Sequence, residues 1–439
     1  MTTLAHTAIA ASPKLILTAD TSGIRWLDNE SAILGATPFA EIWPDALDIR
    51  QVQAFYNANS GRFFLAAIGR IAGGDDNIFI AMSRGDDPAD GWDTMHSHVA
   101  ANLVKFDYLS AGIAGDGIYL SVDTEAGSWF LQMGAEDILN YTQFVWGGRV
   151  SSSEVRFACN ERSGAGDPRL VLCAAKSGSM SRLWFWAKKS EAAGGPSRMF
   201  WLDVPWQSTP PLVQQLGSQD INVGDRDFYA TAINNDSCWM AQTMRIGDHA
   251  IVRWYEIDLR GWPDSAQTPA LKQYGDIDLG PGVHAYQPAI AVDTDGNACL
   301  VYSTSSATSP VTVMRAFRLA ADPPGLMGTP VMVKQGEAPA GTPWGPYSSI
   351  TSDKVGSFWL HAAYPTADGW ETVLHHTTLA PIQTSPGDIN KDGVVDTADL
   401  GILIGQFGTA GPEGDINHDG VVDTADLSIL LGEMNKEQQ

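Results

Sequence analysis

The sequence predicts a large, mainly β domain followed by a small helical domain, and three observations lead to this division. Residues 1 to about 380 are rich in β-branched and aromatic side chains. Turns of Gly, Asp or Asn interrupt them about every 8 to 12 residues, which is typical of short strands in an all-β fold. From Pro386 the composition changes to Asp-rich loops followed by apolar helical stretches. We therefore expect an N-terminal extension at 1–11, the β domain at 12–380, a linker at 381–386 and the helical domain at 387–439.

One β unit recurs along the large domain: an apolar strand, a tight turn and a second apolar strand. About four strands every 40 to 60 residues is typical of a β-propeller, whose blades stack radially because one blade cannot bury both of its faces. The copies favour seven blades, with six as the alternative and a large β-sandwich or a β-helix as the other interpretations. The copies are KLILTADTSGIRWLD, VQAFYNANSGRFFLAAI, YLSAGIAGDGIYLSVD, VRFACNERSGAGDPRLVLCAA, FYATAINNDSCWMAQTM, PAIAVDTDGNACLVYST and SSITSDKVGSFWLHAAY.

The composition is that of a folded protein, since 44% of the residues are apolar and only 18% are charged. Acidic residues outnumber basic residues 51 to 27, a net charge of −24. Electrostatic repulsion therefore argues against nucleic acid and anionic membranes as partners, whereas the same acidity suits a protein that binds cations. No apolar run approaches the roughly 20 residues that span a bilayer, and the first residues, MTTLAHTAIAAS, lack the basic segment of a signal peptide.

Four cysteines lie in apolar, strand-like stretches, and no two of them form a CxxC pair. This pattern indicates buried free thiols rather than a zinc or redox site. A disulfide between Cys159 and Cys173, across one hairpin, is the alternative interpretation.

The strongest motif is a duplication in the last 53 residues. GDINKDGVVDTADLGILIGQFG begins at Gly387 and GDINHDGVVDTADLSILLGEMN begins at Gly414, and 16 of the 22 aligned positions are identical. Each copy reads Asp-x-Asn-x-Asp-Gly-x-x-Asp-x-x-Asp. This is the spacing of an EF-hand loop, whose positions 1, 3, 5, 7, 9 and 12 surround one calcium ion.

The duplicated loops predict two calcium sites, because calcium needs six to eight oxygen ligands and a 12-residue loop can wrap around it. Gly393 and Gly420 stand at position 6, where the turn is sharp. Position 12 is Asp in both copies instead of the usual Glu. A pair of acidic turns with helix-capping aspartates is the plain alternative, but it does not explain the recurring Asn and Gly. The expected ligands are Asp388, Asn390, Asp392, the carbonyl of Val394, Asp396 and Asp399, then Asp415, Asn417, Asp419, the carbonyl of Val421, Asp423 and Asp426.

One helix is expected after each loop, with apolar residues at i, i+3, i+4 and i+7 that would form its buried face. These residues are Leu400, Leu403, Ile404 and Phe407, then Leu427, Leu430, Leu431 and Met434.

A calcium loop followed by a single helix, in two copies, resembles a type I dockerin domain over residues 387 to about 435. The resemblance implies docking to a cohesin-like domain of an extracellular assembly. In that family, positions 10 and 11 of each loop select the partner, and here they are Thr397 with Ala398 and Thr424 with Ala425. Their identity in both copies implies a pseudo-twofold module that can dock in two orientations. Ordinary first-turn helix residues, in a tail that calcium merely folds, are the alternative.

Short strings in the large domain, among them FYNANSGRFFLAAI, FIAMSRGDDPADGW and WGPYSSI, resemble secreted sialidase-like β-propellers of bacteria. This resemblance implies a fold rather than an activity. The repeated Asp-box, Ser-x-Asp-x-Gly-x-Thr-Trp, is missing, since Gly127 in SVDTEAGSW is displaced by two residues. No arginine triad can be assigned from the sequence.

No HExxH, GxSxG, P-loop or dinucleotide motif occurs in a suitable context, so we lean away from an enzyme. Weaker candidates are a further calcium-binding turn at Asp293 and Asp295, which equally makes a plain hairpin turn, and the histidine pairs His96 with His98 and His375 with His376. A platform for stacking sugars is another weak candidate, although such aromatic residues more often fill blade interfaces. Its residues would be Trp184, Trp186, Trp201, Trp239, Trp254, Trp344 and Trp359.

The sequence therefore predicts an extracellular or cell-surface binding or structural protein. Its propeller would recognise a glycan or a protein surface, and its calcium-loaded tail would dock to a cohesin-like partner or a neighbouring subunit. A polysaccharide-degrading hydrolase or lyase delivered by its dockerin is one alternative, and a repeating subunit of a filament or surface layer is the other.

Overall fold

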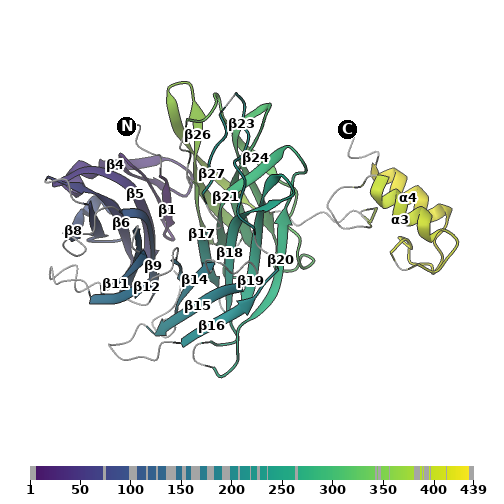
Figure 1. Cartoon of the computed structure of the whole chain (residues 1–439), viewed down its shortest axis with the longest axis horizontal. Helices are drawn as coiled ribbons and strands as arrows, with labels where there is room; N and C mark the ends of the chain where they lie inside the picture. Colours follow the sequence, from purple (N-terminus) through teal and green to yellow (C-terminus); the bar gives the residue numbers. More distant parts are fainter. Residues whose placement is uncertain are drawn as a thin grey trace.

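The structure is a computed structural model of the whole chain (Figure 1). The residues it describes are 6–72, 76–97, 106–114, 117–124, 127–134, 145–150, 155–159, 169–175, 182–189, 198–205, 208–217, 219–224, 228–234, 236–262, 265–341, 344, 348–354, 356–379, 386–387, 389, 395, 397–411 and 413–434. The described strands form seven antiparallel sheets, six with four strands and one with three. The fold is thus mainly β and propeller-like, which confirms this coarser part of the fold class that the sequence predicts.

Each sheet is a meander, because each strand pairs with the strand next to it in the chain. The first sheet is β1 (Ala8–Ala11), β2 (Leu15–Asp20), β3 (Gly23–Asp28) and β4 (Ile33–Pro38), and the second is β5 (Ala46–Asn57), β6 (Arg62–Ile71), β7 (Asp76–Ser83) and β8 (Trp92–Ser97). The third is β9 (Phe106–Ala114), β10 (Gly117–Thr124), β11 (Gly127–Gly134) and β12 (Val145–Val150), and the fourth is β13 (Val155–Cys159), β14 (Arg169–Ala175), β15 (Arg182–Lys189) and β16 (Arg198–Asp203). The fifth is β17 (Phe228–Asn234), β18 (Ser237–Ile246), β19 (His249–Asp258) and β20 (Ala270–Ile277). The sixth is β21 (Val283–Val292), β22 (Ala298–Ser306), β23 (Ser309–Arg318) and β24 (Val331–Gln335), and the seventh is β25 (Ser348–Lys354), β26 (Ser357–Thr366) and β27 (Gly369–Thr378). The short helices α1 (Phe39–Ile42) and η1 (Pro88–Asp90) lie in connections.

The turns that the sequence marks with Asn, Asp and Gly form these hairpins through local hydrogen bonds. Between β5 and β6, the side-chain oxygen of Asn57 accepts the backbone N–H of Asn59 at 2.9 Å and that of Ser60 at 3.3 Å. Gly61 then adopts a φ of +66°, which a residue without a Cβ does at little cost. The recurring turn chemistry thus places strand pairs where the repeat predicts them.

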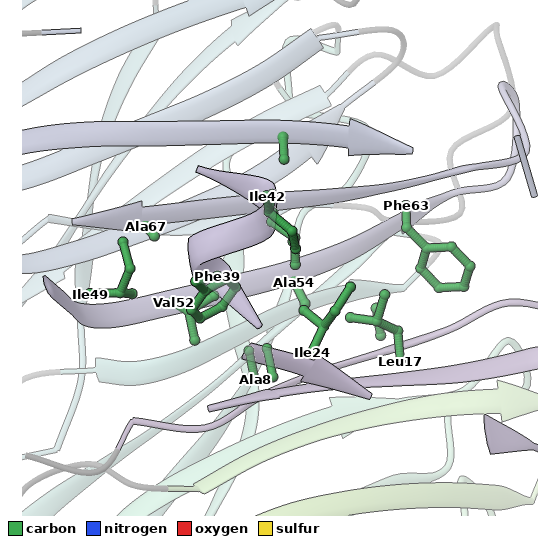
Figure 2. Close-up of a cluster of buried hydrophobic side chains, with 14 of the residues drawn as sticks. Ala8, Leu17, Ile24, Phe39, Ile42, Ile49, Val52, Ala54, Phe63 and Ala67 are labelled. Atoms are coloured by element: carbon green, nitrogen blue, oxygen red, sulfur yellow. The ribbon is translucent and has the colours of Figure 1, made fainter. Parts of the chain in front are cut away.

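The core lies between neighbouring sheets, where apolar side chains from facing strands pack together. Figure 2 shows the cluster between the first and second sheets, in which Leu17, Val52 and Phe63 are fully buried and α1 contributes Phe39 and Ile42. Strands that are buried on both faces read as continuous apolar runs, as in β7, where every residue is buried.

The first and seventh sheets meet at a seam, formed by the apolar residues Ile9, Ile16 and Trp359 and by polar contacts of Thr7 and His361. The first strands of successive sheets contact one another from β1 to β25, and β1 in turn contacts β25 and β26. The Thr7 hydroxyl donates to the carbonyl of His361 at 2.9 Å. The Nδ1–H of His361 donates to the carbonyl of Ala8 at 3.3 Å. Residues some 350 positions apart in the chain therefore hold the first and seventh sheets against each other.

Two expectations about the β domain need correction. The first sheet begins at Ala8, inside the expected N-terminal extension at 1–11, because β1 packs between β2 and the seventh sheet. The Cys159–Cys173 disulfide is incompatible with the register of β13 and β14, since Cys173 pairs with Arg156 and Cys159 pairs with Leu170. Three residues of offset place the two backbones about 10 Å apart, beyond the reach of a disulfide. Cys238 and Cys299 are buried free thiols, as expected.

The tail contains two helices, α3 (Thr397–Gln406) and α4 (Thr424–Met434), which pack against each other (Figure 1). Leu403 and Leu430 are fully buried at the centre of their shared core, with Val422 beside them. The expected buried face is only partly correct, because Ile404, Phe407 and Leu431 are 59%, 45% and 43% exposed. Each helix packs against one other helix, which covers Leu403 or Leu430 at its centre. The apolar residues beside these leucines stay exposed to solvent because no further element covers them in the described part of the chain. No helix in the described part of the chain has the length and apolarity needed to cross a membrane.

Candidate functional site

The second acidic loop, residues 415–426, is curled by hydrogen bonds from its backbone N–H groups to its own side chains. The Asp415 carboxylate accepts the N–H of Asp419 at 3.1 Å and that of Gly420 at 2.8 Å. Gly420 has a φ of +94°, the conformation expected of the glycine at position 6. Asn417 also accepts the N–H of Asp419, at 2.9 Å. Position 1 of the loop is thereby brought to positions 5 and 6.

Asp426, at position 12, connects the end of the loop to its middle from the first turn of α4. Its two carboxylate oxygens accept the N–H of Asn417 at 3.0 Å and that of Asp423 at 2.9 Å. Burial would raise the pKa of Asp426, but the N–H groups of Asp423, Asn417 and Ile416 together hold that pKa below its usual value. This fully buried carboxylate therefore stays ionised at neutral pH.

The first loop repeats one of these contacts. Asp399, at its position 12, is fully buried and accepts the N–H of Ile389 at 2.8 Å. Asp426 interacts with the backbone of Ile416, the equivalent residue of the second loop. The other expected ligands of the first loop, Asp388, Asn390, Asp392, Val394 and Asp396, lie outside the described residues.

The described ligand positions fit calcium by their chemistry. Carboxylates, an amide oxygen and a backbone carbonyl are the hard donors that calcium prefers, and the second loop supplies all three kinds. Within the described ranges, no three His, Cys, Asp or Glu side chains lie close enough together to hold a metal ion. The carboxylates of the second loop instead face backbone N–H groups.

The expected partner-selecting residues, Thr397, Ala398, Thr424 and Ala425, are all exposed on the first turns of α3 and α4. The exposed apolar residue Ile404 lies seven positions after Thr397, and Leu431 lies seven positions after Thr424. Seven residues are two helical turns, so each pair lies on one face of its helix. We call these two equivalent faces, defined by Thr397 with Ile404 and by Thr424 with Leu431, the paired faces.

Most of the tryptophans considered for a sugar platform are core residues instead. Trp239, Trp254, Trp344 and Trp359 are buried. Trp201, on the outermost strand of the fourth sheet, is 43% exposed. The side chains of Trp184 and Trp186 lie outside what the structure describes.

The turn at Asp293 is structural. Its carboxylate accepts the N–H groups of Asp295 and Asn297 at 2.9 and 3.0 Å, as well as the side-chain amide of Asn297 at 2.8 Å and the N–H of Gly356 at 2.7 Å. Both carboxylate oxygens of Asp293 therefore accept hydrogen bonds, and the bond from Gly356 links the sixth sheet to the seventh. A plain hairpin turn accounts for this aspartate.

The histidine pairs do not form metal sites among the described residues. His96 lies against Phe79, with ring centroids 5.9 Å apart, and His98 is outside the described ranges. His376 stacks on Trp359 and contacts the hydroxyl of Ser357 at 2.7 Å. His375 faces the opposite side of β27, because successive residues of a strand alternate.

Sequence motifs missed a polar cluster at the fifth sheet, because its members come from two separate turns. His249 Nε2 lies 2.7 Å from Asp278 Oδ1, and its Nδ1 lies 3.4 Å from Asp248 Oδ1. The hydrogen bond to Asp278 is the main cause that raises the pKa of His249, with Asp248 adding to it. Asp278 lies 29 residues after His249, so no local sequence motif could reveal this pairing.

Comparisons with known proteins do not assign the chain to a family. No protein-family model matches it, and no curated protein matches it. Among solved structures, it is similar to a protein of unknown function from Dyadobacter fermentans, with 9% identity over 75% of this chain and 94% of that one, and a TM-score of 0.41. It is also similar to an apocarotenoid oxygenase from Synechocystis, with 10% identity over 77% and 73% of the two chains and a TM-score of 0.43. A third likeness is to a thermostable family-43 glycoside hydrolase, with 11% identity over 77% and 96% and a TM-score of 0.37. Because these TM-scores lie below 0.5, the likenesses say nothing about activity or partners.

Proposed function

We propose that this is an extracellular binding or structural protein whose tail folds around two calcium ions and docks it to a cohesin-like partner. The observation that carries the proposal is the duplicated set of oxygen donors, each followed by one helix. Asp415 and Asp426 support it, because the backbone orients both carboxylates within the second loop. In the β domain, we propose that the seven sheets are seven blades of a closed propeller, supported by the contact of β1 with β25.

The propeller's proposed role is to recognise a glycan or protein surface while the tail provides attachment. Trp201 and Met199 support this, because they leave 43% and 65% of their surfaces exposed on β16. They stand two residues apart in one strand and so share a face. An exposed aromatic ring beside an apolar side chain suits contact with a sugar ring or another protein.

Removing the first ligand of each loop is expected to abolish calcium-dependent folding of the tail. Small domains with few core residues obtain much of their folding free energy from metal binding. We expect the wild-type protein to bind two calcium ions by calorimetry, and Asp415→Ala to bind one. Asp388→Ala combined with Asp415→Ala should bind none and should lose the calcium-dependent ellipticity at 222 nm.

Glu413→Ala is the matched control, since Glu413 is an exposed acidic residue of the tail outside every ligand position. It should bind two ions, as the wild type does. If the wild-type tail keeps the same helix content in chelator as in calcium, metal-dependent folding is wrong.

Docking is expected to use either of the paired faces. Ile404→Glu or Leu431→Glu alone should leave binding to a type I cohesin domain within a few-fold of wild type, because the other face is intact. The double variant should lose at least about 100-fold in affinity, since a charge buried in an apolar contact is costly at both faces. Surface plasmon resonance against a panel of type I cohesins, with calcium present, measures this.

Glu413→Lys serves as a surface-charge control and should bind normally. Equal binding by the double variant and the wild type would exclude the paired faces as the docking surface. No binding by the wild type to any cohesin in the panel would reject the cohesin-like partner while leaving the calcium result intact.

A further inference from the structure

Arg315, on β23, lies between the sixth and seventh sheets. It pairs across the ladder with Val301 on β22, and directly paired residues share a face of the sheet. Val301 packs against Leu360 of the seventh sheet. The guanidinium of Arg315 lies 5.4 Å from the ring centroid of Phe317, two residues further along the same strand. The side chain is therefore directed into the contact between two sheets.

The guanidinium group of Arg315 carries hydrogen-bond donors for which the described residues supply no acceptor. Its Nε and Nη1 atoms are buried, and neither has a hydrogen-bond partner among the described residues. Stacking on Phe317 uses the face of the guanidinium, whereas its N–H groups point outward in its own plane. A buried donor that has given up water without finding an acceptor is costly, and in native proteins it commonly marks a water or an ion.

The fifth sheet shows how this chain satisfies a similar cation. Arg253 Nε and Nη2 each donate at 2.6 Å to the two carboxylate oxygens of Asp276, forming a bidentate pair. This fork-to-fork geometry is the one that guanidinium groups favour with planar and tetrahedral oxyanions. Arg315 has no corresponding carboxylate within the described residues.

His375, on β27, belongs to the opposite sheet and lies within electrostatic range of Arg315. It pairs with Leu360 on β26 and so shares the face that packs against the sixth sheet. Burial lowers the pKa of His375, and the positive charge of Arg315 and the neighbouring His376 lower that pKa further. The buried Cys299 thiol also lies within electrostatic range of Arg315, and burial raises its pKa to about 12. Cys299 and His375 are thus both neutral at neutral pH and supply no negative charge to the guanidinium.

We propose that Arg315 and His375 form a binding site for a small oxyanion, namely a carboxylate, sulfate or phosphate group, between β23 and β27. The anion would accept the Nε–H and Nη1–H of Arg315, with His375 as the second donor. Both residues are partly exposed, so the site opens to solvent. β27 is the last strand of the three-stranded seventh sheet, and no described fourth strand covers its outer edge.

An anion at this position would counter the positive charge that depresses the pKa of His375. We expect that pKa to rise by about one unit when the site is saturated, which corresponds to roughly tenfold tighter binding once His375 is protonated. Histidine Cε1–H resonances of the full-length protein, titrated at constant ionic strength, report this value. Acetate, sulfate and inorganic phosphate are the probes, with sodium chloride as the reference salt. Preference for acetate indicates a carboxylate ligand, and preference for sulfate or phosphate indicates a tetrahedral one.

Arg315→Gln should weaken binding of the preferred probe at least about tenfold and restore a higher pKa to His375 in the absence of anion. The matched control is Arg182→Gln, which removes an exposed guanidinium that Asp203 already pairs with and should bind as wild type does. If Arg315→Gln does not fold, His375→Gln provides the test. Because this variant lacks the reporting resonance, its binding is measured by isothermal titration calorimetry beside the wild type, and binding should be weaker and independent of pH. The proposal is overturned if no probe shifts the His375 resonances of the wild type. It is equally overturned if the folded variants bind as tightly as Arg182→Gln.

Discussion

Lowering the pH from 7 to 5 is expected to destabilise the β domain by about 4 kcal/mol, with two buried histidines as its origin: His361 at the seam and His6 just before β1. His6 and His361 are both fully buried, and burial lowers the pKa of each from 6.5 to about 4. His361 donates from Nδ1 to Ala8. Neither ring nitrogen of His6 has a partner of good geometry among the described residues, although the Val52 backbone lies nearby. Each imidazole is therefore held neutral next to β1: His6 lies two residues before this strand, and His361 contacts its first residue.

The loss of stability at low pH follows from the difference in proton binding between the folded and unfolded chains. The unfolded chain takes up a proton at each histidine as the pH falls through 6.5, whereas the folded chain does so only near 4. The stability that these neutral groups contribute is thus complete above pH 6.5 and is lost progressively toward pH 4. Between pH 7 and pH 5 each group accounts for about 2 kcal/mol.

Urea denaturation at the two pH values, followed by tryptophan fluorescence, measures this loss. His361→Asn retains an N–H near the Nδ1 position and cannot titrate, so it should reduce the pH-dependent loss by about 2 kcal/mol. His418→Asn, which replaces an exposed histidine of the tail, should leave the loss unchanged. A pH dependence that is identical in wild type and His361→Asn would contradict an origin at the seam.

Trp254→Ala is expected to destabilise the β domain by about 4 kcal/mol, because it opens a cavity between the fifth and sixth sheets. Trp254 is fully buried and stacks on Trp239, with ring centroids 5.7 Å apart and planes 17° apart. On its other side the Arg318 guanidinium lies 5.5 Å from the ring. Gly275 lies so close that a Cβ there would be 2.8 Å from the indole, so the surrounding backbone cannot collapse into the space.

Trp254→Phe provides the graded comparison. The buried indole Nε1 of Trp254 has no acceptor among the described residues, so phenylalanine loses volume but no hydrogen bond and should cost only about 1–2 kcal/mol. Trp201→Ala, at an exposed tryptophan, should cost less than about 1 kcal/mol. Thermal and urea unfolding of the three variants rank these effects. Equal losses for Trp254→Ala and Trp201→Ala would show that the stacked pair does not support this interface.

The sequence was sufficient wherever the relevant residues are neighbours in the chain. The hairpin turn at Asn57 and the curled loop from Asp415 to Asp426 both depend on spacings of a few residues, and local hydrogen bonds from backbone N–H groups to side chains form them. The four-residue strand at Ala8 was missed because alanine has little β propensity. Its place is decided by packing on sheets whose strands lie hundreds of residues later in the chain.

Burial on the tail helices was predictable only in part. The apolar stripe correctly placed Leu403 and Leu430 in the core. It also placed Ile404 and Leu431 there, although both are exposed, because periodicity gives the direction of a side chain and not the size of the element that covers it. Arg315 and His375 lie 60 residues apart on different sheets, and no spacing rule connects them.

The three-stranded seventh sheet determines how the molecule would bear mechanical load. If the tail docks as proposed, tension would enter the β domain at the C-terminal end of β27, which pairs only with β26 among the described strands. Pulling on an outermost strand of a meander breaks its ladder hydrogen bonds one after another, as in opening a zipper, rather than all at once. Under force β27 would therefore separate from β26 while β26 stays paired with β25. The released strand would lengthen the tether while the other six sheets stay folded.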